Sequence, residues 1–346
     1  MAGSLFDRAF AVLFGRDQQV RPDEDRQFVA ELTDMIVDTV EPKVRVDRHY
    51  RQKLEPCVRA TIAWLRRLGR TPLAPLLLTR AAWNRDPALH AFFARADDIP
   101  EFLGRSKDLR AFFADPANAG VDEAIALLGM RREEKTVLAP RQVEGRLVEE
   151  VPQVTVNFTG HRLVAPSATE QHTRMEVGQR IMLRLAQVAL GRILEIDRQG
   201  VQAQQHKAYM VTRLRFLKLA QDGMEGIVED PATIASQIAA AQRELDQAVK
   251  DYIEVKSSLA TLDGYIAQIA EVFGHPEQHV SLAQSELRLD RMNVKVEAGG
   301  EQPHQALTLA ELRVGDRLQA VVALVRVPRS ELPPEEDLLA KAERFL

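Results

Sequence analysis

The chain has 346 residues, of which 45% are apolar and 28% are charged, and its formal net charge is −4. This composition can bury a substantial core in about two domains, and it excludes global disorder. Cys57 is the only cysteine, which excludes an intramolecular disulfide and a cysteine-rich zinc site. The N-terminus lacks a secretion-signal pattern, and no run of about 18 apolar residues could span a bilayer. We therefore expect a cytoplasmic protein, and a nearly neutral charge argues against nucleic acid as a partner.

The first predicted element is an amphipathic helix over residues 4–14, with Phe6, Phe10 and Phe14 among the residues on its apolar face. Such a helix docks on its own domain or lies in a membrane surface, and docking is the usual case. A second helix is predicted after Pro22. The first helix leaves open an attachment to the surface of the inner membrane.

Residues 43–70 carry nine basic and two acidic side chains, a net charge of +7. They are predicted to form a helix over about 48–68, with a basic outer face that pairs with acidic neighbours. The alternative is a patch for an anionic partner, formed by Arg51, Arg59, Arg66, Arg67 and Arg70. Cys57 follows Pro56 in this helix, and a small buried residue is a better interpretation than a reactive thiol.

Two similar blocks then follow at a spacing of twenty residues, Leu89–Ala94 and Leu109–Ala114, each with a Phe-Phe pair. Each block follows a polar start typical of a helix N-terminus, so the phenylalanines are predicted to clamp neighbouring helices. A further helix is predicted over 121–129. Together these elements predict an all-helical N-terminal domain over residues 1–135.

From residue 137 the apolar pattern changes to a period of two, which is typical of strands. Strands are predicted in 136–168 and again in 281–330, with the two-sided apolar stretch Leu318–Val327 as a central buried strand. The two ranges are predicted to form one discontinuous antiparallel β-domain. A short C-terminal helix is predicted over 331–346.

Residues 169–280, between the strand ranges, are predicted to form an inserted antiparallel coiled-coil hairpin. From Ile234 to Phe273, twelve positions at alternating steps of four and three are all apolar, which is a heptad seam that needs a partner helix. A similar seam runs through 175–217. Residues 170–220 carry a net charge of +5 and residues 229–273 carry −5, so the two arms attract one another. Glycines and a proline in 223–231 predict the tip. The predicted fold is therefore mostly α (α+β).

His275 and His279 are weak candidate metal ligands, because they are four residues apart but Pro276 between them makes the segment a turn. A polar cap at the end of the long helix is the better interpretation. No phosphate-binding loop, dinucleotide fingerprint or nucleophile elbow is present. We therefore predict no cofactor and no catalytic residues.

The leading hypothesis is a non-enzymatic structural or adaptor protein that uses the hairpin for protein–protein contact or self-assembly. Its predicted contact residues are Ile238, Leu245, Tyr252, Leu259 and Ile266. The alternatives are a peripheral membrane protein, held by the 4–14 helix and the basic 43–70 face, and an enzyme whose site is assembled from distant residues. In architecture, the plan resembles β-domain adaptors with coiled-coil hairpins, a likeness that does not establish function.

Overall fold

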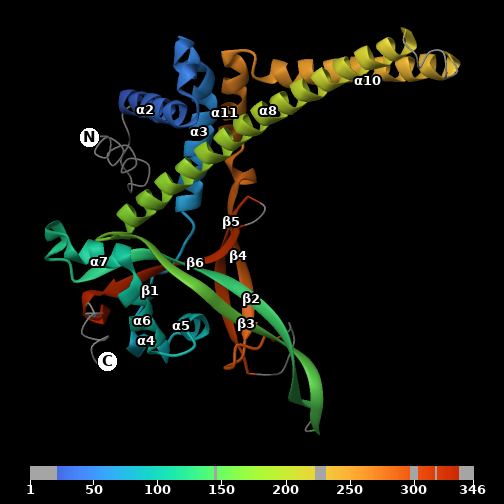
Figure 1. The fold of residues 1–346 in the computed structure, drawn as a ribbon. Coiled ribbons are helices and arrows are strands. Elements are labelled where there is room, and N and C mark those ends of the chain that lie inside the picture. The colour runs from blue at the N-terminus through green and yellow to red at the C-terminus, as the bar shows by residue number, and fades with distance from the viewer. Residues whose placement is uncertain (1–21, 144–145, 223–230, 297–302, 316–317, 335–346) are drawn as a thin grey trace, which may run out of the picture. The chain divides into compact units, whose positions relative to one another are not determined.

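The computed structural model describes residues 22–143, 146–222, 231–296, 303–315 and 318–334. They form the predicted mostly helical α+β fold, with a long helical hairpin inserted between strands of one sheet (Figure 1). The predicted helix over 4–14, the predicted tip over 223–230 and most of the predicted helix over 331–346 lie outside the described residues.

The described helices, in chain order, are α2 (Pro22–Val40), α3 (Tyr50–Gly69), α4 (Arg80–Trp83), α5 (Pro87–Phe92), α6 (Asp98–Arg105), α7 (Lys107–Ala114), α8 (Glu170–Asp222), α10 (Pro231–Ser258) and α11 (Leu262–Gly274). Short 3-10 turns are η1 (Pro42–Val46), η2 (Pro116–Asn118), η3 (Pro276–Gln278) and η4 (Arg329–Glu331). The strands are β1 (Leu76–Leu77), β2 (Glu123–Val143), β3 (Arg146–Ser167), β4 (Val280–Leu289), β5 (Gln305–Val314) and β6 (Leu318–Pro328).

The chain divides into two compact units. The sheet unit contains the described residues of 64–181 and 277–334, and the hairpin unit contains those of 22–63 and 182–276. The range predicted as an N-terminal helical domain, 1–135, is shared between them. Its α2 and the first part of α3 belong to the hairpin unit, whereas α4–α7 belong to the sheet unit.

In the sheet unit, the strands before and after the hairpin join one sheet in the order β3-β2-β6-β5-β4, as the sequence predicts. The short β1 pairs with β6 in parallel, and the other neighbours are antiparallel. A tight turn after β4 brings Val294 opposite Thr155 of β3 and Lys295 opposite Leu289 of β4. This segment therefore bridges the two edge strands of the sheet.

The helix predicted over 121–129 is wrong, because residues 123–129 form the start of β2. Ala124, Ala126 and Leu128 alternate inward along a strand that pairs with β3 on one side and β6 on the other. The short apolar run is compatible with either period. Backbone pairing along both edges, which the local sequence does not specify, decides for the strand.

The two-sided apolar pattern of β6 is explained by helices that pack against both faces of this strand. Val321, Val325 and Val327 face a core cluster that also contains residues of α5, α6 and α7. On the other face, Val322 and Leu324 line an apolar cavity of about 70 Å³ together with the last turns of α3 and the first turns of α8. The prediction that Leu318–Val327 is a central strand is confirmed, and its burial begins at Val321, since Leu318 is 61% exposed.

The repeated Phe-Phe blocks form α5 with its C-cap and α7, but they pack on the sheet instead of in a separate helical core. The Phe92 ring lies edge-on to Phe158 of β3 at 4.9 Å, and Phe93 stacks on His161 of the same strand at 4.6 Å. Arg329, which directly follows β6, donates hydrogen bonds to the carbonyls of Phe113 and Asn118. These contacts fix α5 and α7 to the sheet.

In the hairpin unit, α8 and α10 run antiparallel, as predicted (Figure 1). Arg213 pairs with Glu244 at 2.7 Å, and the Lys207 ammonium lies 4.0 Å from the centre of the Tyr252 ring. A β-carbon at Gly200 would lie 3.8 Å from the Val255 side chain. From one pair to the next, the position in α8 rises from 200 to 207 to 213 while the position in α10 falls from 255 to 252 to 244. This opposite order is the pattern of an antiparallel hairpin.

The second arm is not one continuous helix, which corrects the prediction for Ile234–Phe273. α10 ends at Ser258 and α11 begins at Leu262, after the extended residue Thr261. A β-carbon at Gly264 would lie 2.1 Å from the Ser258 carbonyl oxygen, so the turn needs a glycine there. Figure 1 shows the change of direction between the two helices. Spacing of apolar residues continues across the turn and therefore does not reveal it.

The base of the hairpin unit is a core formed by α2, α3 and α11. Ile36, Leu54 and Phe273, one from each helix, are completely buried. The Thr61 hydroxyl donates a hydrogen bond to the Phe273 carbonyl, and Lys53 pairs with Asp263 at 2.5 Å. Contacts over more than two hundred residues of sequence therefore join the start of the chain to the end of the hairpin.

Candidate functional site

The inner seam, which comprises the apolar a/d positions of α8 and of 234–273, is buried or half-buried at every position in the structure. The predicted contact residues belong to it: Ile266 is buried, and Ile238, Leu245, Tyr252 and Leu259 are half-buried. Tyr252 is covered by Lys207 of α8. The inner seam therefore joins the two arms of one chain.

A second apolar surface on α8 was not predicted. Five large side chains, here called the outer stripe, are between 56% and 66% exposed: Leu194, Val201, Tyr209, Phe216 and Leu219. Successive members are seven, eight, seven and three residues apart. At 100° per residue they share one side of the helix, opposite Ile193, Met210 and Leu214 of the inner seam. In the described part of α10, only Ile253 is comparably exposed.

The outer stripe lies in a basic stretch. Residues 194–219 carry five basic and two acidic side chains, a net charge of +3. Arg198 is paired with Glu195 of its own helix, and Arg213 with Glu244 of the opposite arm. Arg215 and Lys218 make no ion pair among the described residues. Arg215, next to Phe216, therefore adds an unpaired positive charge beside the exposed apolar side chains, whereas Lys218 follows the buried Leu214 by four residues and lies on the inner side of α8.

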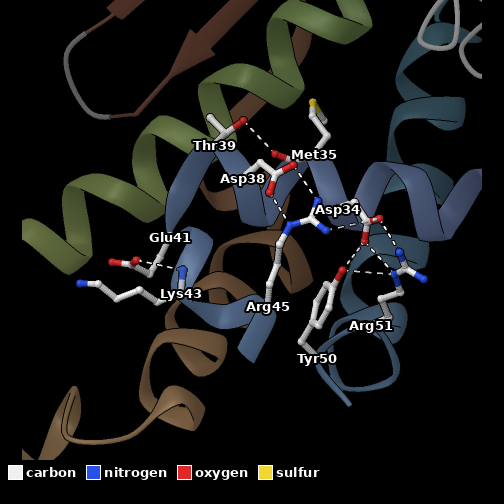
Figure 2. Close-up of polar contacts among 9 residues, drawn as sticks. All are labelled: Asp34, Met35, Asp38, Thr39, Glu41, Lys43, Arg45, Tyr50 and Arg51. Atoms are coloured by element: carbon white, nitrogen blue, oxygen red, sulfur yellow. Dashed lines mark hydrogen bonds and ion pairs between the residues drawn. The ribbon is translucent and has the colours of Figure 1, made fainter. Parts of the chain in front are cut away.

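A cluster of charged side chains holds α2, η1 and α3 together in the hairpin unit (Figure 2). Arg51 donates two hydrogen bonds to the Asp34 carboxylate, at 2.8 and 2.6 Å, and the Tyr50 hydroxyl donates a third at 2.5 Å. Arg45 makes a two-pronged contact with Asp38, at 2.5 and 2.7 Å. Both arginines are paired with a carboxylate of the same cluster. We therefore infer that the cluster holds the three elements together.

The electrostatics of this cluster stabilise its charged forms. Partial burial acts to raise the pKa of Asp34, but hydrogen bonds from Arg51 and Tyr50 outweigh it and lower the pKa below 3.8. The hydrogen bond to Asp34 in turn raises the pKa of Arg51, and that to Asp38 raises the pKa of Arg45. Burial and the contact with Asp34 raise the pKa of Tyr50.

The five arginines of the predicted anionic-partner patch are divided between the two units. Arg51 is held by Asp34, and Arg59 pairs with Glu55 at 2.8 Å. Arg66, Arg67 and Arg70 belong to the sheet unit, whereas the first two belong to the hairpin unit. Pairing with acidic neighbours, the simpler of the two interpretations, therefore holds for Arg51 and Arg59.

The remaining sequence candidates are Cys57, His275 and His279. Cys57 is buried, and burial raises the pKa of its thiol to about 11, so the buried interpretation holds. His275 caps the C-terminus of α11, and His279 follows the η3 turn. Among the described residues, no group of three or more His, Cys, Asp or Glu side chains could hold a metal ion. None of the described helices combines the length and apolarity needed to cross a membrane.

Comparison of the chain with protein-family models, with curated proteins and with solved structures gives no match. A functional conclusion has to come from the chain's own surfaces. Of these, the outer stripe has a signal in the sequence, because Leu194, Val201 and Phe216 already lie at helical repeats outside the a/d frame. It is overlooked when only the strongest seam is followed.

Proposed function

We propose that the chain is a structural or adaptor protein whose helical hairpin binds an acidic amphipathic helix of a partner protein along the outer stripe of α8. The single observation that supports this proposal most strongly is the row of five exposed apolar side chains on an otherwise polar helix surface. Apolar surface of this kind, flanked by polar residues, is typical of an interaction site.

The shape of the stripe favours a helix as its occupant. From Leu194 to Leu219 the stripe extends for about 38 Å at 1.5 Å per residue, and it is one side chain wide. An amphipathic helix presents apolar anchors at matching intervals of three, four and seven residues, so it can cover the whole stripe. A small molecule would cover only a fraction of this length.

Charge favours an acidic partner over a second copy of this chain. Two outer stripes packed together would bring two stretches of net charge +3 side by side, which is unfavourable. The acidic arm of a second copy has a suitable charge, but its apolar side already covers α8 and Ile253 is the exposed exception in α10. A partner with acidic flanks and a free apolar face satisfies both requirements.

The test uses a designed amphipathic helical peptide of about 26 residues, the length of the stripe. One version carries Glu beside its Leu positions, and the other carries Lys at the same places. By fluorescence anisotropy, the Glu peptide should bind the full chain at least about tenfold more tightly than the Lys peptide. Equal binding of the two peptides would contradict the proposal.

Matched variants locate the surface. The triple substitution Leu194→Gln, Val201→Gln and Phe216→Gln should abolish binding of the Glu peptide and leave the helical circular dichroism unchanged. Ile253→Gln, which removes an exposed apolar side chain from the acidic arm, should leave binding unchanged. Flotation of the intact chain with anionic vesicles through the same three residues would favour a membrane surface instead. Dimerisation that the triple substitution abolishes would favour a second copy.

A further inference from the structure

The sheet unit contains a groove of about 770 Å³ between β3 and the helices α6 and α7. Its volume lies within the range of small-molecule sites, about 300–1,000 Å³. Phenylalanines contribute much of its apolar lining, namely Phe92, Phe93, Phe102 and Phe158. The groove is separate from the outer stripe, since its residues all belong to the sheet unit.

His161 of β3 lies among these rings. It is stacked on Phe93, with ring centres 4.6 Å apart, and Phe102 lies edge-on at 5.8 Å. The Nε2–H group donates a hydrogen bond to the Phe92 carbonyl at 2.9 Å. Burial lowers the pKa of His161, so the ring is neutral at pH 7 and its Nδ1 carries the lone pair. The imidazole therefore adds a flat, uncharged surface to the lining.

The charged residues of the groove that form no ion pair with another described residue are mostly positive. Glu101 is bonded to Arg105, and Asp98 accepts hydrogen bonds from Arg95. The charged lining residues that remain are Lys107, Arg162, Arg180 and Asp108. The three cations make no ion pair among the described residues. With one opposing carboxylate, they leave an excess of two positive charges.

We propose that this groove binds a small aromatic phosphate, with its ring against Phe102 and His161 and its phosphate among Lys107, Arg162 and Arg180. The charge of a phosphate monoester, about −1.5 to −2 at pH 7, matches the excess of the rim. Arginine and lysine supply charge-assisted hydrogen bonds to phosphate oxygens. Aromatic side chains favour edge-on or offset contact with a planar ring.

The binding experiment uses phenyl phosphate, with phenol and inorganic phosphate as the two halves of the ligand. By isothermal titration calorimetry, phenyl phosphate should bind at least about tenfold more tightly than either half. The imidazole resonances that disappear from the spectrum of His161→Gln should shift in the native chain when phenyl phosphate is added. No detectable binding of phenyl phosphate would overturn the proposal, and so would binding that leaves these resonances unmoved.

Substitutions separate the groove from general electrostatic attraction. Arg162→Gln and Lys107→Gln should each weaken phenyl phosphate binding about two- to fivefold, the effect expected for an exposed charge contact. Phe102→Leu should weaken phenyl phosphate and leave the weak binding of inorganic phosphate unchanged. Arg313→Gln removes an exposed cation of β5 outside the groove and should have no effect. An equal loss of affinity in Arg313→Gln and Arg162→Gln would overturn the proposal.

Discussion

The inner and outer faces of α8 both carry apolar side chains at helical repeats, yet among the described residues only the inner face is covered. On the inner face, Ile193 is 2% exposed, whereas its neighbour Leu194 on the outer face is 58% exposed. A heptad pattern therefore shows that a face needs cover, but it does not say what covers it. In this chain one face closes the hairpin, and we propose that a partner covers the other.

The difference between the two faces is tested most severely by placing a charge on each face at adjacent positions. Ile193→Asp buries an unpaired carboxylate and removes a core side chain, so we expect a loss of about 3 kcal/mol or more. Leu194→Asp replaces an exposed side chain that has the same size as Ile193, and it should alter stability by less than about 0.5 kcal/mol. Urea unfolding followed by circular dichroism measures both. Similar losses in the two variants would mean that the faces are assigned wrongly.

The two arms differ as well, because α8 is continuous whereas α10 and α11 are separated by a turn. Gly264→Ala places a β-carbon against the Ser258 carbonyl and should cost about 1–3 kcal/mol, the usual range for overpacking. Gly191→Ala in α8 meets no atom within 4 Å and should stabilise the helix by about 0.5–1 kcal/mol. The melting temperatures of the two variants should therefore shift in opposite directions from that of the native chain. A harmless Gly264→Ala would show that the close approach is absent.

The apolar seam and the charged cluster beneath it should respond differently to acid. The folded-state pKa of Asp34 is lower than 3.8, so its ionised form contributes stability that is complete above pH 3.8. That contribution is lost as the pH falls through the lowered value. Asp34→Asn should be less stable than the native chain at pH 7, and the difference should narrow in this acid range. A difference that is constant from pH 7 to pH 2 would contradict the assigned role of Asp34.

Local patterns in the sequence predicted the parts of the fold that depend on one clear period. The twelve apolar positions of 234–273 and the two-sided run Leu318–Val327 each specify their burial directly. Residues 121–129 failed because a short apolar run fits a helix or a strand, and its pairing partners β3 and β6 lie far away in sequence. The turn at 258–262 was missed because Gly264 and Thr261 interrupt no apolar position.

The surfaces were harder to predict than the fold. The inner-seam residues Leu245 and Tyr252 were expected to meet another molecule, since spacing does not distinguish a partner arm from a partner protein. The groove beside His161 is formed by α6, α7 and β3, and no local sequence motif indicates that these elements lie side by side. Exposure decides these cases, and it becomes known only when the chain is folded.

A disulfide lock across the inner seam tests the central claim most directly. A β-carbon at Gly200 would lie 3.8 Å from the Val255 side chain, so Gly200→Cys with Val255→Cys should give an oxidised bond within one chain. Cys57 will not compete, because it is buried with a thiol pKa of about 11. The decisive measurement is binding of the Glu peptide to the locked hairpin before and after reduction. We predict equal affinity in both states and a monomeric mass throughout. Binding that is lost in the oxidised state and regained on reduction would show that the partner uses the inner seam, and a disulfide-linked dimer would show that the arms pair between chains.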